Sequence, residues 1–395
     1  DSLNRALYPV GHPYHHSVIG SMNDLNAASL ADVHQWFRAW YGPNNAVLVL
    51  AGDIDLATAK QKVAQYFGDI PAGPTLSQPR VNVAKRSADT RQEMTDQVPQ
   101  ARIYRAWNVA QTGTLDVDQL QVLGSVLGGA KSSRLAKRLL HADQLVDNVS
   151  AGVFASQLGS NFIVMATVKQ GVEPARVEAI IDEEMGRLLK DGPSADELER
   201  AKTGFRAGFI RGIERIGGFG GKADALAECT VFEGDPGCFR QSLANIQAMT
   251  AEGISAAGRK WLDVGSHTLV VVPGPRVALE EAPAQVPAPF NLPAPDKRFS
   301  TTASTVDRSA GVPRTESFPE LKFPSQQHAV LSNGTRVVLA QRHEIPVVQL
   351  SYQFPGGFSA DQGRKQGTAS FTAGLMDEGA AGRDSLAFGE ALDAL

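Results

Sequence analysis

Three histidines lie within five positions near the start of the chain, in the stretch HPYHH. His12, His15 and His16 are three of only eight histidines, and neutral imidazoles are common zinc ligands. A zinc-binding pair normally stands on one helical face, but Pro13 interrupts that spacing because proline disfavours the helical conformation in the residue before it. No cysteine is nearby, and Asp24 lies eight residues beyond the last of the three. We therefore interpret HPYHH as a turn with packing or surface histidines rather than a metal site.

Cys229 and Cys238 are the only two cysteines, and a Gly/Pro turn lies between them. A disulfide here would close a short loop and would favour a periplasmic or secreted protein. Two ordinary thiols in a reducing compartment fit the sequence equally well. Both interpretations stay open, and the localisation is undetermined.

Two further histidines and one glycine run complete the candidate residues. We expect His141 and His267 on the surface, at helix or strand edges without partners, and assign both a structural role. The run GGFGG at 217–221 lacks the Lys-Ser/Thr that follows a phosphate-binding loop, so it predicts a flexible kink between helices.

The bulk composition is that of a soluble globular protein. The chain has 395 residues, 43% hydrophobic and 20% charged, with a net charge of −4. At about 150 residues per domain, that length predicts two or three domains. The charge balance gives no reason to expect a nucleic-acid partner or an anionic membrane surface. The longest purely apolar run, 46–51, is far shorter than the roughly 20 residues of a membrane-spanning helix, so no transmembrane segment is predicted.

Both ends of the sequence suggest an internal piece of a longer protein. The first residue is Asp1 rather than methionine, and the final EALDAL stops within an amphipathic pattern. No stop signal for a helix follows it. We therefore expect further domains on either side.

Two segments of the chain align with each other without a gap. SLADVHQWFRAWYGPNNAVLVLAGD starts at Ser29 and TAEGISAAGRKWLDVGSHTLVVVPG starts at Thr250, an offset of 221 residues. Each predicts a helix, a short turn and a buried apolar strand, at 46–50 in the first and at 268–272 in the second. Because Pro/Gly-rich breaks follow both, we interpret each as the end of a domain.

Capping signals support two of the predicted helices, one of them in this repeat. Ser29 with Asp32 matches the capping-box pattern, and Ser194 with Glu197 matches it at a later helix. Apolar residues then recur at helical spacing in the first segment. They are Val33, Trp36, Phe37 and Trp40.

A weaker match between PQARIYRAW and PVVQLSYQF, from Pro99 and Pro346, links domain openings and predicts a strand in each. Together the matches divide the chain into four parts. These are the end of one domain at 1–75, a complete domain at 80–274, a linker at 275–324 and the start of a third domain at 325–395. The linker holds nine of the 22 prolines, so it predicts an extended connector.

The complete domain has its strands and helices in groups. We predict a strand, helices at 116–128 and 133–142, strands across 148–169, and then several helices. This grouping is typical of an α+β fold, with helices covering one face of a mainly antiparallel sheet.

Three stretches carry a resemblance to a known family. GHPYHHSVIGSMNDLNAASLADVHQWFRAWYGPNNAVLVLAGDID, LGGAKSSRL at 127–135, and LSNGTRVVLAQRHEIPVVQLSYQFPGGFSADQGRKQGTASF from Leu331 occur in the order of landmarks of the pitrilysin/insulinase zinc metallopeptidases. The resemblance implies repeated domains in a two-half clam-shell, which cleaves peptides or unfolded polypeptides in an enclosed chamber. It also implies a zinc cofactor held by an inverted H-x-x-E-H motif and a distal glutamate.

No H-x-x-E-H motif occurs in this sequence. The resemblance places the active copy, with its catalytic residues and zinc ligands, before Asp1. In the third-domain copy, Ser370, Ala373 and Gly374 stand where the first histidine, the catalytic glutamate and the second histidine would be. None of these side chains can bind zinc or take up a proton at neutral pH. We therefore expect neither a metal site nor catalysis in this chain.

Two functions follow from the resemblance. In the first, the parent protein is an active zinc endopeptidase and this chain forms part of its chamber wall and hinge. In the alternative, the parent is a catalytically inactive homologue that acts as a structural or peptide-binding subunit. The expected partners are peptide substrates, and a homo-oligomer or a partner subunit stays open.

Overall fold

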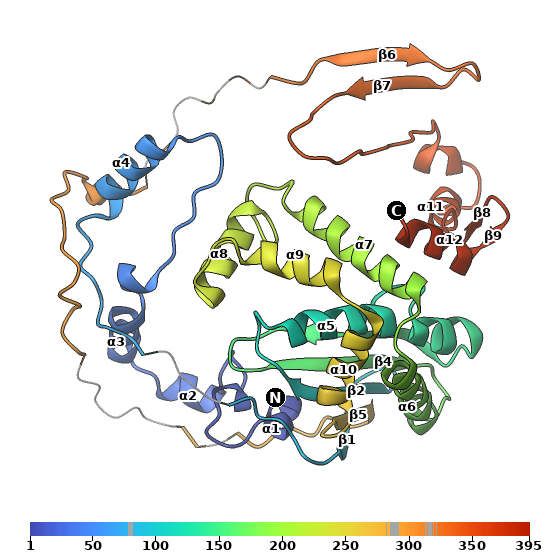
Figure 1. Cartoon of the computed structure of the whole chain (residues 1–395), viewed down its shortest axis with the longest axis horizontal. Coiled ribbons are helices and arrows are strands. Elements are labelled where there is room, and N and C mark those ends of the chain that lie inside the picture. The colour runs from blue at the N-terminus through green and yellow to red at the C-terminus, as the bar shows by residue number, and fades with distance from the viewer. Residues whose placement is uncertain are drawn as a thin grey trace.

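A five-stranded sheet forms the centre of the chain, and its strands lie in the order β1-β5-β2-β4-β3 (Figure 1). The computed structural model describes residues 1–77, 82–281, 283–284, 292–312, 314, 318, 320 and 322–395. The strands are β1 (Thr90–Asp96), β2 (Arg102–Val109), β3 (Val146–Phe154), β4 (Ser160–Val168) and β5 (His267–Pro273). Only the β1–β5 pair is parallel. The predicted α+β fold with a mainly antiparallel sheet is confirmed.

Helices cover one face of this sheet. Those closest to it are α5 (Leu115–Gly124), α6 (Pro174–Asp191) and α10 (Ala251–Leu262), while α7 (Ala195–Gly212), α8 (Lys222–Glu233) and α9 (Cys238–Ala248) form an outer layer on α5 (Figure 1). Two π-helical segments, Ser125–Gly129 and Ala136–Ala142, continue from α5 toward β3. Among the described residues no helix is both long and apolar enough to span a lipid bilayer.

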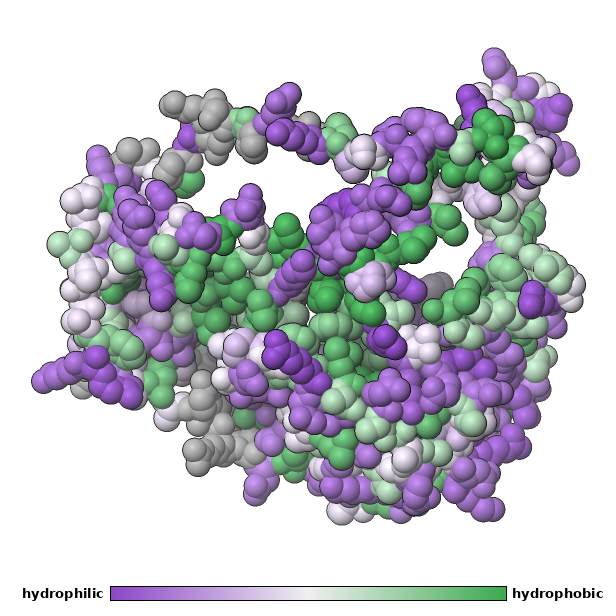
Figure 2. Space-filling model, turned by 45° about the horizontal axis from the view of Figure 1, so that its top comes forward, coloured by the Kyte–Doolittle hydropathy of each residue, from purple (hydrophilic) through white to green (hydrophobic). Residues whose placement is uncertain are grey.

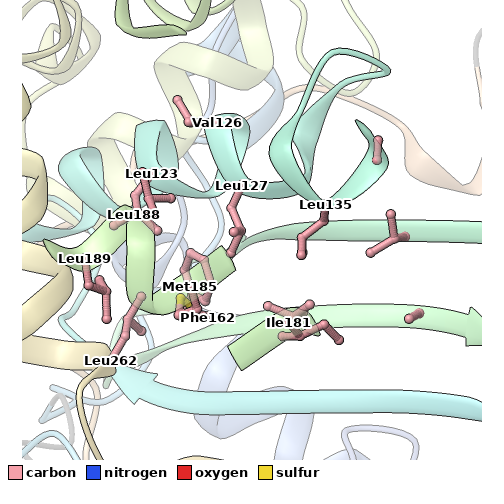
Figure 3. Packing of buried hydrophobic residues seen from close by; sticks show 14 of the residues in the cluster. Leu123, Val126, Leu127, Leu135, Phe162, Ile181, Met185, Leu188, Leu189 and Leu262 are labelled. Carbon is pink, nitrogen blue, oxygen red and sulfur yellow. The ribbon is translucent and has the colours of Figure 1, made fainter. Parts of the chain in front are cut away.

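The core lies between this sheet face and the inner helices. Strand β4 alternates buried and half-buried residues, as a strand with one covered face must. Figure 3 shows Phe162 of β4 beneath Leu123 and Leu127 of the α5 region and beside Met185 of α6. Phe162 is fully buried and contacts Trp107 edge to face, with ring centroids 6.0 Å apart. These apolar contacts hold the helical layer on the sheet.

Gly128, the first glycine of the LGG motif at 127–129, permits close packing of the first π-helical segment on β3. A Cβ atom on Gly128 would lie 2.5 Å from the backbone nitrogen of Ala151 in β3. No side chain fits at that distance, so the π-helical segment can approach β3 only with glycine here.

The predicted capping boxes are confirmed. The Ser29 side chain accepts from the Asp32 amide, and the Asp32 carboxylate accepts from the Ser29 amide. Ser194 and Glu197 form the same reciprocal pair at the start of α7. These bonds satisfy amides that have no partner within the helix.

The N-terminal segment contains helices but no sheet. Its helices are α1 (Ser2–Leu7), α2 (Met22–Ala27), α3 (Leu30–Trp40) and α4 (Leu56–Phe67), with 3₁₀ turns at Pro13–His15 and Pro43–Asn45. The strand predicted at 46–50 is wrong, whereas its repeat partner forms β5, paired on both sides. A strand needs a neighbour for its backbone groups, and residues 1–77 contain no other strand.

The apolar face of α3 is exposed for the same reason. Val33, Trp36, Phe37 and Trp40 are 46, 53, 50 and 45% exposed, whereas Ile254, the α10 counterpart of Val33, is fully buried. Figure 2 shows apolar surface in the left half of the molecule, the side on which Figure 1 places α3 and α4. The two halves of the repeat thus share local structure and differ in what covers them.

The C-terminal segment forms a small module beside α7 (Figure 1). It consists of the hairpins β6 (Gln326–Val330) with β7 (Arg336–Ala340) and β8 (Gly379–Ala380) with β9 (Arg383–Asp384), a 3₁₀ turn at Gly357–Asp361, and helices α11 (Thr368–Gly374) and α12 (Ser385–Asp393). The strand predicted after Pro346 is wrong. Residues 347–354 pair with no strand in the described chain, and all of them except the half-buried Val347 are exposed, so the ladder hydrogen bonds of a sheet have no partner strand there.

The proline-rich linker falls partly outside the described residues. Its described part includes a 3₁₀ turn at Arg308–Ala310 and packs along α4. Arg308 donates two 2.8 Å hydrogen bonds to the carboxylate of Asp69, and the Thr302 amide donates to the Gly68 carbonyl.

Replacing Phe162 by alanine should destabilise the central sheet. The change leaves a cavity between β4 and the helices, so the free energy of unfolding should fall by about 3–5 kcal/mol. Urea denaturation followed by circular dichroism measures it. Phe358→Ala is the control, because Phe358 is 81% exposed and its loss should cost no more than about 0.5 kcal/mol. Equal effects of the two changes would contradict this assignment of the core.

Candidate functional site

The three residues that the resemblance assigns to a degenerate zinc motif lie on one short helix, α11 (Thr368–Gly374). Its first turn contains Ser370, and its end contains Ala373 and Gly374. The helix is largely exposed. The buried carboxylate of Asp361 accepts hydrogen bonds from the amides of Gly367 and Ala369, which fixes the start of the helix. The three residues carry a hydroxyl, a methyl and a hydrogen, whereas the motif implied by the resemblance consists of two imidazoles and a carboxylate. These residues do not fit a zinc ion.

The HPYHH stretch forms a 3₁₀ turn that packs against the sheet face opposite the helical layer. The His12 ring stacks on Tyr8, with centroids 4.7 Å apart, and its Nδ1 accepts from the Tyr14 amide at 3.0 Å. His15 Nδ1 lies 2.7 Å from the Tyr8 carbonyl oxygen, whereas His16 is exposed. Across the described chain, no group of three or more histidine, cysteine, aspartate or glutamate side chains could hold a metal ion.

Two asparagines on adjacent strands anchor this N-terminal segment to the sheet. The Asn108 side chain, 3% exposed, donates to the carbonyls of Leu7 and Ala84, both at 2.8 Å. The Tyr8 hydroxyl donates to Asn161 Oδ1 at 2.9 Å. Burial raises the pKa of Tyr8 to about 12, so it stays a neutral donor. No sequence signal points to either asparagine, because nothing in a single strand indicates what will cover its second face.

His267 is buried, so its predicted surface position is wrong. It is 4% exposed at the start of β5, and its Nδ1 lies 2.8 Å from the Thr90 hydroxyl. Arg86 also donates to Thr90 and to the carbonyl of Ala6 in α1. Burial first, and the nearby Arg86 guanidinium second, lower the pKa of His267. The misplacement arose because the prediction treated the start of this strand as an edge, whereas β5 lies between two other strands.

His141 is half-buried near the end of the second π-helical segment, and its Nε2 atom is buried without a hydrogen-bond partner among the described residues. It lies in no metal-binding group. Its predicted structural role stays a prediction.

Cys229 and Cys238 lie at disulfide distance. They join the end of α8 to the start of α9, and their Cα atoms are 5.4 Å apart. The GGFGG run forms the turn between α7 and α8. Of the two states that the sequence allowed, the structure has the disulfide.

The segment after the LGG motif contacts the C-terminal module. Lys131 Nζ lies 2.8 Å from a Glu378 carboxylate oxygen, and Lys137 pairs with Glu390. The Ser132 hydroxyl donates to Asp393 at 2.6 Å. The segment 131–137 and residues 378–393 therefore lie side by side through complementary charges and a hydrogen bond.

A cavity of about 600 Å³ lies at this contact, between α7, residues 125–133 and residues 392–395. We call it the interface cavity. Hydroxyls, guanidinium groups and apolar side chains line it together, including Ser133, Arg200 and Phe205. Such a lining can bind a peptide through hydrogen bonds and apolar contact.

Sequence reasoning missed the pairing across this contact. The only signal is that lysines and arginines gather at 131–138 while acidic residues recur at 377–393. Complementary charge in one sequence does not say which segments meet, since exposed charges are usually solvated.

The family profile described as "Peptidase M16 inactive domain" matches residues 27–205. This range begins at the end of α2 and ends within α7. It therefore includes α3 and α4 of the N-terminal segment and the strands β1 to β4 of the central sheet.

Curated relatives are named zinc proteases. The chain is 25% identical to the zinc protease PqqE of Helicobacter pylori, over 52% of this chain and 47% of that protein. It is 25% identical to the zinc protease ML0855 of Mycobacterium leprae, over 71% of this chain and 61% of that protein. YmxG of Bacillus subtilis is 24% identical, over 54% of this chain and 51% of that protein. The chain thus spans about half to three fifths of the length of these relatives.

Solved structures share the fold. A protease from Helicobacter pylori has a TM-score of 0.64 at 20% identity, covering 69% of this chain and 66% of that one. A peptidase M16 inactive domain from Pseudomonas fluorescens has a TM-score of 0.61 at 22% identity, covering 71% and 66%. With the family match, these similarities confirm the resemblance noted in the sequence.

Acidification should destabilise the contact that surrounds His267. Its pKa is lowered in the folded chain, so below the unfolded value of about 6.5 the unfolded chain binds the proton more readily. Stability therefore falls as the pH drops through 6.5, by at most about 1.4 kcal/mol per pH unit. Urea denaturation between pH 7.5 and 5.5 should show a shallower pH dependence for His267→Gln. His328→Gln, which removes an exposed histidine of β6, should leave the dependence unchanged; an equal effect would contradict the assignment.

Reversing the charges of the ion pairs beside the interface cavity should release the C-terminal module. Exposed ion pairs contribute only about 0–1 kcal/mol each, so the contact should be weak and sensitive to salt. Lys131→Glu with Lys137→Glu should speed amide exchange in α12 several-fold, as should about 0.5 M salt in the unchanged protein.

Two further variants make this test specific. Adding Glu390→Lys to Lys137→Glu restores opposite charges and should slow the exchange again. Lys322→Glu, at an exposed position outside the contact, should have no effect. Unchanged exchange in the double variant would show that the ion pairs do not hold the module.

Proposed function

We propose that this chain, whose residues 27–205 match the peptidase M16 inactive-domain profile, is the non-catalytic middle part of a zinc-dependent endopeptidase. The parent protein cleaves peptides or unfolded polypeptides in an enclosed, clam-shell chamber, and this chain supplies wall and hinge. One observation carries the non-catalytic role: α11 holds Ser370, Ala373 and Gly374 at the motif positions, and none of them can serve zinc chemistry.

The internal repeat supports the proposed domain division. In the central domain, α10 packs on α5 and α6, and β5 lies between β1 and β2. The matching unit at 29–53 has its helix and its extended segment uncovered in the described chain. We propose that residues 1–75 complete another domain of the same architecture, which supplies the missing helices and strands.

The same logic extends to the remaining boundaries. Residues 80–274 form the second domain of the parent, 275–324 the linker between halves, and 325–395 the start of a degenerate third domain. The exposed residues 348–354 support this division, because an extended apolar segment needs a sheet to cover it. Zinc belongs to the parent's first domain in this proposal.

Peptides are the proposed partners of this part of the chamber. The interface cavity supports that role, since it offers hydrogen-bonding and apolar groups together at the contact of two modules. The bonded Cys229 and Cys238 support an exported parent, because disulfides persist in oxidising compartments. No residue of this chain enters a catalytic step.

Zinc content and peptide hydrolysis test the proposal. After dialysis, the purified chain should hold far less than one zinc per molecule and should not cleave unfolded peptides. His15→Ala with His16→Ala is the matched control, and it should not change the zinc content. One tightly held zinc per chain would contradict the proposal.

The complete gene product should bind zinc and hydrolyse the same peptides. Removal of zinc by a chelator should abolish hydrolysis, and restoring zinc should recover it. A complete product that neither binds zinc nor cleaves would instead support the inactive homologue that acts as a structural or peptide-binding subunit.

A further inference from the structure

A second cavity, of about 540 Å³, lies between α5, α7, α8 and α9. It is distant in sequence from HPYHH, from α11 and from the C-terminal module. Four aromatic rings contribute to its lining: Phe205, Phe209, Phe232 and Phe239. Phe209 and Phe239 stack, with centroids 5.3 Å apart. The cavity is therefore an aromatic pocket within the outer helical layer.

The carboxylate of Asp118 lies in the wall of this cavity. Asp118 is 9% exposed, and its two oxygens accept from the Ser242 hydroxyl at 3.0 Å and the Asn245 amide at 2.8 Å. Both donors are neutral. In the described part of the chain no lysine, arginine or histidine pairs with this carboxylate. Burial raises the pKa of Asp118, and the two hydrogen bonds oppose that shift.

A buried carboxylate without a counter-ion is costly in free energy. The two hydrogen bonds offset part of the desolvation, but a cation of opposite charge would offset much more. The other charged residues in the lining also favour a cationic ligand. They are two acids, Glu228 and Glu233, and one base, Arg215. The Arg215 guanidinium donates to the carbonyl of Phe219 instead.

The helix α8 covers one side of the cavity between two glycine turns. Gly218 and Gly220 have φ of 78° and 74° in the turn before it, and Gly234 has φ of 75° after it, a conformation that favours glycine. The disulfide then ties α8 to α9. The GGFGG run thus forms the turn before α8, and the cysteine pair fixes α8 to α9 at the boundary of this cavity.

We propose that this cavity binds an organic cation, with the Asp118 carboxylate as its counter-ion and the phenylalanine rings around its apolar body. An ammonium or guanidinium group is attracted both by the carboxylate and by aromatic faces. The same chemistry is available from a basic side chain of a bound peptide and from a free amine.

Calorimetric titration of the full chain tests the proposal with three probes. Phenylethylammonium carries the charge, 2-phenylethanol is its neutral counterpart, and an acetylated, amidated Phe-Lys dipeptide presents the charge on a side chain. We expect the ammonium to bind about tenfold or more tightly than the alcohol, a difference that reflects its charge. Equal affinities, or no binding of the ammonium, would overturn the proposal.

Variants locate the site. Asp118→Asn keeps the size of the side chain and should remove the preference for the ammonium. Asp116→Asn is the matched control, because Asp116 lies on the same helix but pairs with Lys260 and Trp261 outside the cavity. Phe232→Leu should lower the affinity for the ammonium probe without changing the fold. A preference that survives in Asp118→Asn would place the cation elsewhere.

The third probe separates the two sources. Binding of the dipeptide with the ammonium assigns the cavity to peptide side chains, and binding of the ammonium alone assigns it to free amines. Both outcomes support a cation site. If Asp118→Asn does not fold, the comparison of ammonium and alcohol on the unchanged protein still decides the matter.

Discussion

The insertion of β5 between β1 and β2 is the constraint on which the central sheet and its helices depend. β1 pairs with no other strand in the described chain, and β2 would otherwise have one neighbour. Since β5 follows α10 directly, its pairing also fixes α10 against α5 and α6. The last strand of the sheet, β5, therefore pairs with the first, β1. The helices between them in sequence must pack so that this pairing can form.

Local signals in the sequence were sufficient for most of this domain. Ser194 with Glu197 predicted the start of a long helix, and the apolar run at 268–272 predicted a buried strand; both agree with the structure. These features depend on hydrogen bonds and periodicities within a few residues. The α+β class followed from the grouping of such elements along the chain.

The wrong predictions have a different physical origin. Residues 46–50 have a strand-like pattern, yet a strand exists only where another strand accepts its backbone groups. His267 was misplaced because its burial is caused by β1, Arg86 and α1, which are distant in sequence. The surroundings of Asp118 likewise depend on segments that only the fold brings together, and so does the pairing of Lys137 with Glu390.

The apolar face of α3 has a consequence for the behaviour of this chain in solution. Trp36, Phe37 and Trp40 expose aromatic surface on one side of a helix, and contiguous apolar patches of this kind promote association. A net charge of −4 over 395 residues provides little electrostatic repulsion between molecules. The colloidal stability of the isolated chain should therefore be limited by α3, whatever the thermodynamic stability of its central sheet.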